Sequence, residues 1–171
     1  MVVAAAVATT VLVTRGGSSG TGAGYSTSAT AFVLPRLSGA GKVSLASFRG
    51  EPAVVTVFSS SCQACVMELP LLAGAAQELH GQVAFIGVDS DDSGGGLAIA
   101  RQEGIGSWPL ARDVGGGDGS GLKESLGGSA GLPLTAFYSP QGKLLAVDAG
   151  QLSAAQLGST LYQLFGVRVQ L

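Results

Sequence analysis

The sequence is poor in charge, and this shortage excludes one class of partner. Only 12% of its 171 residues are charged, and the formal net charge is −2. Because no basic block is present, nucleic acid is not expected as a partner. Hydrophobic residues make up 46% of the chain, which is typical of a protein with a buried core and not of a disordered one. The length predicts one ordinary domain with an extension.

Cysteine and histidine are also scarce. The only two cysteines are Cys62 and Cys65, and a disulfide between them closes so short a loop that it adds little stability. A structural zinc site needs about four ligands, and the rest of the chain offers one histidine, His80. A c-type haem needs histidine after the second cysteine, where Val66 stands. Redox chemistry is the favoured interpretation, with a short inert disulfide or a metal site as alternatives; no metal or cofactor is expected.

The two cysteines lie where a predicted strand meets a predicted helix. The apolar, β-branched run 53–58 is typical of a buried central strand, and the apolar spacing after Cys65 predicts a helix over 63–79. Unpaired N–H groups and the macrodipole at a helix N-terminus favour an anion. A thiol placed there is expected to lose its proton more readily than a free thiol.

The remaining patterns complete an alternating order of strands and helices. The final helix opens with a capping box, Ser153-Ala154-Ala155-Gln156. The order along the chain is strand, strand, helix, strand, helix, loop, strand, strand, helix, which predicts an α/β fold: a central mixed β-sheet with helices on both faces and an added N-terminal β extension. Besides the central strand and its helix, we expect strands near 32–35, 43–45, 83–89, 134–138 and 143–147, and a helix near 97–103.

The N-terminal part differs from the rest in composition. Residues 1–14 are uncharged and mostly apolar, yet shorter than the roughly 20 residues that span a bilayer and without a basic flank. We interpret them as a hydrophobic membrane anchor or signal remnant; the alternative is a buried N-terminal strand or helix. Residues 15–30 are rich in Gly and Ser and predict a flexible linker. The compact domain is expected over 31–167, followed by a tail, 168–171.

The stretch from Phe32 to Gly166 resembles the thioredoxin fold. It is most similar to the membrane-anchored, extracytoplasmic thiol-disulfide oxidoreductases of the TlpA/ResA type. Four features in this order carry the resemblance: Cys62-x-x-Cys65 after the central strand, Val66-Met67-Glu68-Leu69-Pro70 after it, Gly131-Leu132-Pro133 where thioredoxins place a cis-proline, and a hairpin containing Gln141-Gly142-Lys143.

The resemblance implies a catalytic group of three residues. Cys62, nearer the strand end, is the expected attacking thiolate, and Cys65, one turn inside, the thiol that resolves the mixed disulfide. Glu68 lies three residues past Cys65 on the same helical face, and the resemblance implies that it is a general base or proton reservoir for that thiol. The alternative for Glu68 is an ordinary surface glutamate that favours the N-terminal half of the helix.

The resemblance also implies a binding surface for an extended substrate. A cis Leu132–Pro133 bond is expected to face the cysteines and to pair with the substrate backbone. Gln63 and Ala64, between the cysteines, are expected to contact the substrate as well. Met67 is expected to be a core residue.

The chain departs from the family pattern at three positions. Ser61 stands where Trp usually precedes the first cysteine, and the only tryptophan, Trp108, lies elsewhere, either lining the groove beside the thiols or packing in the core. Ala64 stands where proline is common. Thr56 stands where cytoplasmic thioredoxins have a buried acid, six residues before the first cysteine. These departures affect the expected redox potential and electron donor more than the expected fold.

The function expected from these features is thiol-disulfide exchange outside the cytoplasmic membrane. The expected protein is a monomer tethered by its N-terminal anchor, fed by a membrane-bound electron donor, and acts on protein thiols or disulfides, as a reductase in cytochrome c maturation or of exported proteins. The alternative direction of exchange is oxidation of exported proteins by the same two cysteines. Two alternatives remain: a peroxiredoxin, for which Ser59 fits but Val55 replaces the expected proline, and a non-catalytic client-binding module.

Overall fold

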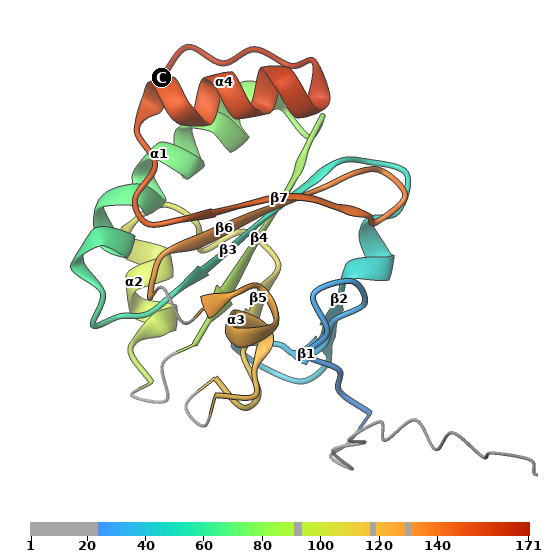
Figure 1. The fold of residues 1–171 in the computed structure, drawn as a ribbon. Helices are drawn as coiled ribbons and strands as arrows, with labels where there is room; N and C mark the ends of the chain where they lie inside the picture. The colour runs from blue at the N-terminus through green and yellow to red at the C-terminus, as the bar shows by residue number, and fades with distance from the viewer. Residues whose placement is uncertain (1–23, 91–93, 117–118, 129–130) are drawn as a thin grey trace, which may run out of the picture.

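The computed structural model describes residues 24–90, 94–116, 119–128 and 131–171. Its strands form one two-stranded and one five-stranded sheet, and the fold is drawn in Figure 1. The strands are β1 (Val33–Pro35), β2 (Lys42–Ser44), β3 (Ala53–Phe58), β4 (Ala84–Asp89), β5 (Leu110–Arg112), β6 (Leu134–Tyr138) and β7 (Leu144–Ala149). The helices are the 3₁₀ turn η1 (Leu45–Phe48) and the α-helices α1 (Gln63–Leu79), α2 (Gly96–Gln102), α3 (Leu122–Ser125) and α4 (Ala154–Phe165).

The larger sheet is mixed, with the strand order β5-β4-β3-β6-β7. Strand β3 is its centre: it pairs in parallel with β4 and antiparallel with β6, and all six of its residues are buried. Because parallel strands end at the same edge, the carboxyl ends of β3, β4 and β5 lie together there. The antiparallel β6 begins at that edge, where Leu134 pairs with Val57.

The two faces of this sheet bury different elements. Alternate residues of β3 point to opposite faces, as the period of a strand requires. Val55 and Val57 contact the side that carries α3 and the two-stranded sheet. Val54 and Phe58 contact the side that carries α1, α2 and α4. The expected α/β fold with a mixed sheet and helices on both faces is confirmed.

The expected N-terminal β extension is the small antiparallel sheet of β1 and β2. It lies on one side of the larger sheet, below β5 in Figure 1. Residues 24–30, which the sequence analysis placed in the linker, contact this domain. Ala29 is buried, and its carbonyl accepts a hydrogen bond from the Tyr138 hydroxyl (2.8 Å). The side chain of Ser125 donates to the carbonyl of Thr27 (2.7 Å).

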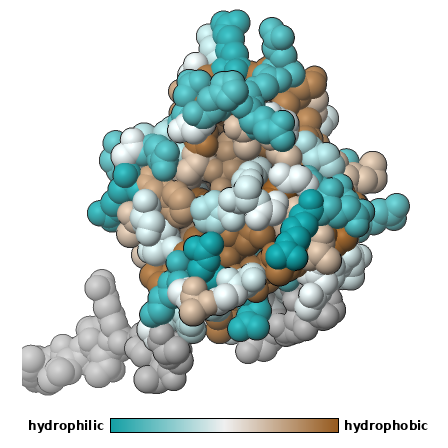
Figure 2. All heavy atoms as spheres, turned by 180° about the vertical axis from the view of Figure 1, so that it is seen from behind, coloured by the Kyte–Doolittle hydropathy of each residue, from teal (hydrophilic) through white to brown (hydrophobic). Residues whose placement is uncertain are grey.

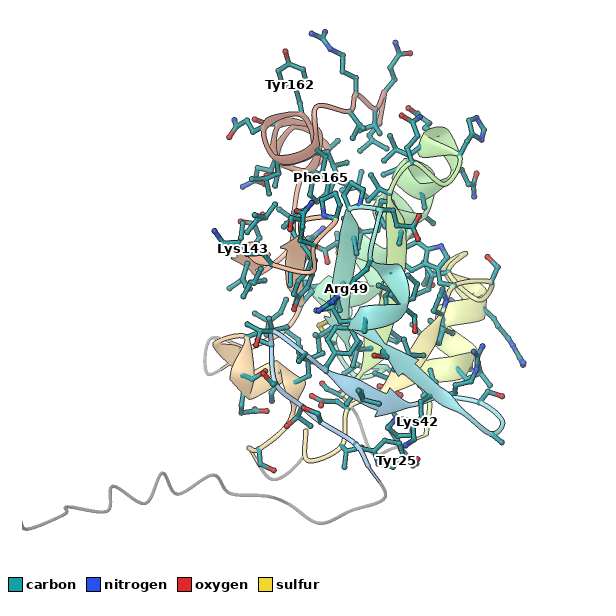
Figure 3. The ribbon with its side chains drawn as sticks, turned by 90° about the vertical axis from the view of Figure 1, so that its right-hand side faces the viewer. Tyr25, Lys42, Arg49, Lys143, Tyr162 and Phe165 are labelled. Atoms are coloured by element: carbon teal, nitrogen blue, oxygen red, sulfur yellow. A yellow bond between two sulfur atoms is a disulfide. The ribbon has the colours of Figure 1, made fainter. Side chains whose placement is uncertain are left out.

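Helix α4 closes the opposite face beside α1. Its N-terminus is the predicted capping box, with Ser153 and Gln156 bonded to each other's backbone. Figure 3 shows Phe165 pointing from α4 towards the sheet, where its ring lies 6.3 Å from that of Phe137, whereas Tyr162 points away and is exposed. After Gly166 the chain returns over the helices, and the Gln170 N–H donates to the Glu78 carboxylate (2.7 Å).

The bounds of the main elements agree with those expected from sequence. The helix expected over 63–79 has those bounds, and it ends at His80 in the left-handed conformation. The 3₁₀ turn η1 was not predicted. The expected anchor, residues 1–14, lies outside the described residues. Among the helices that the structure describes, none has the length and apolar character that crossing a membrane requires.

Candidate functional site

The two cysteines lie at the end of the central strand and form a disulfide. Cys62 is the N-cap residue of α1, and Cys65 lies in its first turn, with Cα atoms 5.2 Å apart. The Sγ atom of Cys62 accepts a hydrogen bond from the backbone N–H of Cys65 (3.1 Å). Cys62 is partly exposed, whereas Cys65 is fully buried. Only Cys62 is therefore accessible to another protein.

The loop before Cys62 is held by its own serines. The hydroxyls of Ser59 and Ser61 are hydrogen-bonded to each other (2.8 Å), and the Ser61 N–H donates to the Ser59 hydroxyl (3.2 Å). The Cys62 N–H donates to the Ser59 carbonyl (3.2 Å). Ser61, which replaces the family's tryptophan, is exposed. A compact polar turn thus leads from β3 into the helix.

The loop that leads into β6 brings a proline to the same edge of the sheet. The Leu132–Pro133 bond is cis, as expected from sequence. Leu132 and Cys62 both pack against the apolar cluster that includes Cys65 and Phe58. The Pro133 carbonyl accepts a hydrogen bond from the Gly150 N–H (2.9 Å). Within the described residues no backbone hydrogen bond to Leu132 is present, so its peptide groups are free to pair with an added chain.

Glu68 lies on the buried side of α1, with 0% of its side chain exposed. Its Oε1 atom accepts a hydrogen bond from the Leu152 N–H (2.8 Å), and its Oε2 atom accepts one from the Thr135 hydroxyl (3.3 Å). Burial raises the pKa of this carboxyl, against the lowering effect of the two hydrogen bonds, and the nearby charge of Asp148 raises it further. The alternative that Glu68 is a surface glutamate is therefore wrong.

Thr135, which completes the environment of Glu68, had no expected role from the sequence. Thr135 lies in β6 directly opposite Thr56 in β3. Both are buried and both face α1, since their strand neighbours Val57 and Leu134 face the other side. The hydroxyl of Thr56 has no hydrogen-bond partner in the described part of the chain. Two buried hydroxyls thus lie side by side next to a buried carboxyl.

Met67 differs from its expected placement, and Trp108 takes one of the two placements that the sequence left open. Met67, expected in the core, is 60% exposed, one turn along α1 from the cysteines. Trp108 packs on Phe85 with ring centroids 5.2 Å apart. Trp108 also packs against the apolar cluster that includes Cys65, so its side chain contacts both this cluster and the one that includes Phe85. The packing alternative for Trp108 is the one observed.

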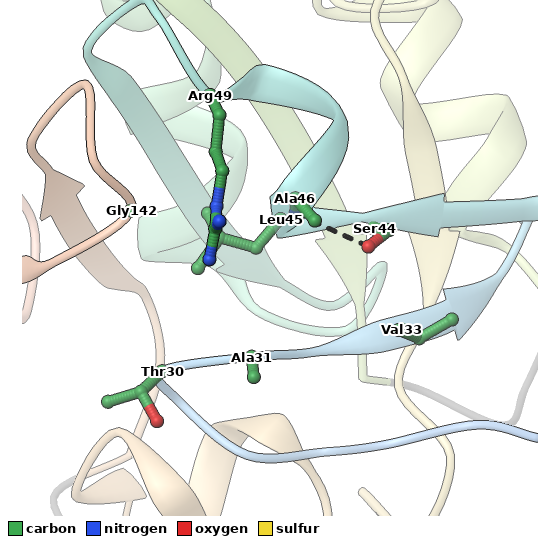
Figure 4. A pocket seen from close by; sticks show the side chains of 8 residues that line it. All are labelled: Thr30, Ala31, Val33, Ser44, Leu45, Ala46, Arg49 and Gly142. Atoms are coloured by element: carbon green, nitrogen blue, oxygen red, sulfur yellow. Dashed lines mark hydrogen bonds between the residues drawn. The ribbon is translucent and has the colours of Figure 1, made fainter.

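Of the other residues expected to bind substrate, Gln63 is exposed and Ala64 is partly exposed, both beside Cys62. No group of three or more His, Cys, Asp or Glu side chains able to hold a metal ion occurs in the part of the chain that is described. A hollow of about 170 Å³ lies between β1, β2 and the turn at Gly142. Figure 4 shows the Arg49 side chain pointing into it. That turn follows the end of β6 far from the thiols, so the hollow is separate from the dithiol.

The surface offers no single large apolar face on the side seen in Figure 2, where apolar and polar side chains alternate. The exposed large apolar side chains of the described residues are scattered, and Met67 is the one beside the cysteines. This edge of the sheet therefore carries the accessible sulfur of Cys62, a few apolar side chains near it and the unpaired backbone of Leu132. The buried carboxyl of Glu68 lies further along α1.

Comparison with known proteins agrees with this geometry. The AhpC/TSA family model matches residues 26–144. No curated protein sequence matches the chain.

Among solved structures, MTB DsbF in its mixed oxidised and reduced forms is 24% identical, with 79% of this chain and 96% of that chain covered and a TM-score of 0.66. A secreted Mycobacterium tuberculosis disulfide oxidoreductase homologous to E. coli DsbE is 22% identical (80% and 98% covered, TM-score 0.64). A DsbF homologue from Corynebacterium diphtheriae is 20% identical, with 79% of this chain and 85% of that chain covered and a TM-score of 0.67. Such likenesses establish the thioredoxin-like fold, and the family match over well more than half of the sequence establishes that this chain belongs to the AhpC/TSA family.

Proposed function

We propose that this chain is an extracytoplasmic thiol-disulfide oxidoreductase that acts on protein substrates through Cys62 and Cys65. The observation that carries the proposal is the asymmetry of the pair: one sulfur is accessible at the helix N-terminus, and the other is fully buried one turn inside. Thiol-disulfide exchange needs one sulfur that meets the substrate and a second that only has to meet the first.

The exchange proceeds in two balanced steps. The Cys62 thiolate attacks a sulfur of a substrate disulfide, so that a mixed disulfide forms and one substrate thiolate leaves. Cys65 then loses its S–H proton and attacks the Sγ atom of Cys62; the mixed disulfide breaks and the second substrate thiolate leaves. Two electrons have passed to the substrate, and the disulfide that the structure contains is the product state. An electron donor must then reduce it.

The backbone at the start of α1 activates Cys62. No Lys, Arg or His lies within several residues of it in sequence. The N–H of Cys65 already donates to its sulfur, and the same donor with the helix dipole stabilises a thiolate there. We expect the pKa of the Cys62 thiol to lie modestly below that of a free thiol.

Glu68 takes the proton that Cys65 must lose. The two residues are three positions apart on one helical face, and both are fully buried. A buried carboxyl with a raised pKa is a better base than an exposed one, because it holds a proton nearer neutral pH. Its position behind Cys65, out of reach of the substrate, suits a proton acceptor for the second step alone.

The substrate lies extended across the edge formed by Leu132 and Pro133. The free backbone groups of Leu132 can pair with an extended segment in the manner of an added strand. We expect Gln63, Ala64 and Met67, which are exposed or partly exposed near Cys62, to contact that segment.

We place the protein outside the cytoplasmic membrane, tethered by residues 1–14 through a flexible linker and acting as a monomer. The relatives support an extracytoplasmic position: one is described as secreted and another as a pneumococcal exposed lipoprotein thioredoxin. The proposed direction is reduction of protein disulfides, in cytochrome c maturation or of exported thiols, with a membrane-bound donor. A reduction potential near that of thioredoxin supports this direction; a far more oxidising one supports the reverse.

The two alternatives gain no support from the site. A peroxiredoxin would use a free hydroxyl before the cysteine, but the Ser59 hydroxyl is bonded to Ser61, and Val55 lies inside a buried strand. A client-binding module would not need one accessible and one buried sulfur. Turnover with peroxide would favour the first alternative over our proposal.

Reduction of insulin disulfides tests the proposal. Wild-type protein supplied with a dithiol is expected to reduce insulin, Cys62→Ser to be inactive, and Cys65→Ser to accumulate a mixed disulfide with its client. Absence of insulin reduction by both wild type and Cys62→Ser would contradict the proposal and favour the non-catalytic binding module.

A further inference from the structure

The hollow that Arg49 enters lies where three segments far apart in the chain meet. One segment is β1 with the residues just before it, the second runs from the end of β2 through η1, and the third is the turn between β6 and β7. The volume of the hollow is about 170 Å³. An apolar cavity of about 150 Å³ holds one benzene molecule, so this hollow has room for a small organic ligand.

Backbone hydrogen bonds between these segments fix the walls of the hollow. The Leu45 N–H donates to the Phe32 carbonyl (3.1 Å), which joins η1 to the segment before β1. The Gly50 N–H, directly after Arg49, donates to the Pro140 carbonyl (2.8 Å), which joins the end of η1 to the turn between β6 and β7. Because the walls are already bonded to one another, a ligand does not have to order them, and this lowers the cost of binding.

The lining combines apolar side chains with hydroxyls. Leu45, which is buried, and Val33, which is partly buried, supply apolar surface. Thr30 and Ser44 supply hydroxyls. The Ser44 oxygen accepts a hydrogen bond from the Ala46 N–H (3.3 Å), so its own O–H can still donate. The hollow therefore suits a ligand that has an apolar body and an acceptor group.

Arg49 gives the hollow a positive charge that nothing in the described part of the chain neutralises. Its side chain points into the hollow (Figure 4), and among the described lining residues it is the charged one. Within the described residues its guanidinium has no hydrogen bond or ion pair, and Glu51, the nearest acid in sequence, is not bonded to it. A guanidinium presents a planar fork of N–H donors that matches the two oxygens of a carboxylate.

We propose that this hollow is a binding site for a small monocarboxylate, whose carboxylate pairs with Arg49 and whose apolar body lies against Leu45. The charge of Arg49 disfavours a cation, and an inorganic anion has no apolar body to cover the apolar surface. The site lies away from Cys62, since the turn at Gly142 follows the end of β6 that is far from the thiols. The inference goes beyond the proposed exchange activity and does not rest on it.

The test is titration of the oxidised full-length protein with benzoate, followed through the backbone amide signals in NMR spectra. Saturable shifts are expected at Ala31, Ala46 and Gly142, with a dissociation constant of about 1 mM for so small a ligand. Benzamide has the same shape and no charge, and it is expected to bind about tenfold more weakly, because the charge-assisted pair is lost. Absence of saturable shifts at these residues, or equal binding of benzoate and benzamide, would overturn the inference.

Three variants separate a built site from general attraction of an anion. Arg49→Gln is expected to weaken benzoate binding about tenfold, to the level of benzamide. Ala46→Leu keeps the charge of Arg49 and is expected to abolish binding, because the larger side chain fills the hollow. Arg101→Gln removes an equal charge from an exposed residue of α2 and is expected to bind benzoate as wild type does.

Equal weakening in Arg49→Gln and Arg101→Gln, or unchanged binding in Ala46→Leu, would overturn the site. Insulin reduction by Arg49→Gln should equal that of wild type, because Arg49 lies outside the exchange machinery. The two proposals therefore fail separately: binding is measured on the oxidised protein without turnover, and exchange is measured without benzoate.

Discussion

Two of the buried carboxyls in the described part of this domain, Glu68 and Asp113, have surroundings that differ in one decisive way. Asp113, just after β5, accepts hydrogen bonds from the N–H groups of Leu122 (2.6 Å) and Lys123 (2.9 Å), at the start of α3. Glu68 accepts one from a backbone N–H and one from a hydroxyl. Burial raises the pKa of both. Burial and a raised pKa therefore do not by themselves distinguish a reactive acid from a structural one.

The kind of partner makes the distinction. A backbone N–H can only donate, so both partners of Asp113 require it to remain an acceptor. A hydroxyl can donate or accept, so the Thr135 partner of Glu68 tolerates a proton on the carboxyl. Asp113 is thereby suited to hold a short helix in place, and Glu68 to exchange a proton. The matched amide variants of the two acids test this division.

The largest effect is expected for Glu68→Gln. An amide cannot accept the proton of Cys65, so the second step of exchange should slow by about a hundredfold, within the range for general base catalysis. The unfolding free energy should change little, because the amide still accepts from Leu152 and the Thr135 hydroxyl can turn to accept from it. Stopped-flow measurement of mixed-disulfide decay checks the rate, and an unchanged rate would assign Glu68 a structural role.

Asp113→Asn is expected to lower the stability of the fold and to leave the exchange rate unchanged. Its amide nitrogen would face a backbone donor, which leaves one N–H of α3 unpaired and should lower the unfolding free energy by about 2 kcal/mol. The rate of exchange per folded molecule should equal that of wild type. Urea denaturation measures the unfolding free energy. Glu51→Gln, which removes the same charge from a partly exposed acid, is the control. A slowed exchange in folded Asp113→Asn would contradict the division of roles.

The pH dependence of stability gives a third comparison. Because the pKa values of Glu68 and Asp113 are raised in the folded state, each of these groups binds more protons in the folded protein than in the unfolded chain at pH values between its two pKa values. Their contribution to stability is therefore fully present below the unfolded pKa and is lost as pH rises through the folded pKa. Denaturation midpoints measured across this range should fall with pH, and each amide variant should flatten the slope. A slope unchanged in both variants would count against both assignments.

The smallest effect is expected for Thr56→Val. Valine has nearly the same shape and no hydroxyl, so removal of the unpartnered buried hydroxyl should raise the unfolding free energy by up to about 1 kcal/mol. Thr56→Ser serves as the control. Destabilisation by valine at all pH values would mean that the Thr56 hydroxyl is permanently paired.

Local patterns were enough to predict the frame of the site. The apolar run before Cys62 and the apolar spacing after Cys65 predicted β3 and α1 with the observed bounds, since each signal lies within one element. The cis bond before Pro133 followed from the family resemblance and is confirmed. The roles of the residues at this edge, including Gln63 and Ala64 as substrate contacts, remain predictions.

The surroundings of the site could not be predicted in this way, because they are made by residues far apart in the chain. The partners of Glu68 lie 67 and 84 positions away, and a glutamate near the start of a helix is usually exposed. Asp113 caps a helix nine residues later across a glycine-rich loop that has no periodic signal. Met67 was expected in the core because it is apolar, but the packing of α1 leaves its side of the helix uncovered.

The most direct test is to identify the sulfur that carries the stalled intermediate. Reduced Glu68→Gln, mixed with a peptide disulfide and quenched with acid, is expected to hold the peptide on Cys62, with Cys65 as a free thiol, when its fragments are weighed by mass spectrometry. Asp113→Asn treated in the same way should accumulate no such species. Peptide attached to Cys65, or equal accumulation in the two variants, would contradict the account.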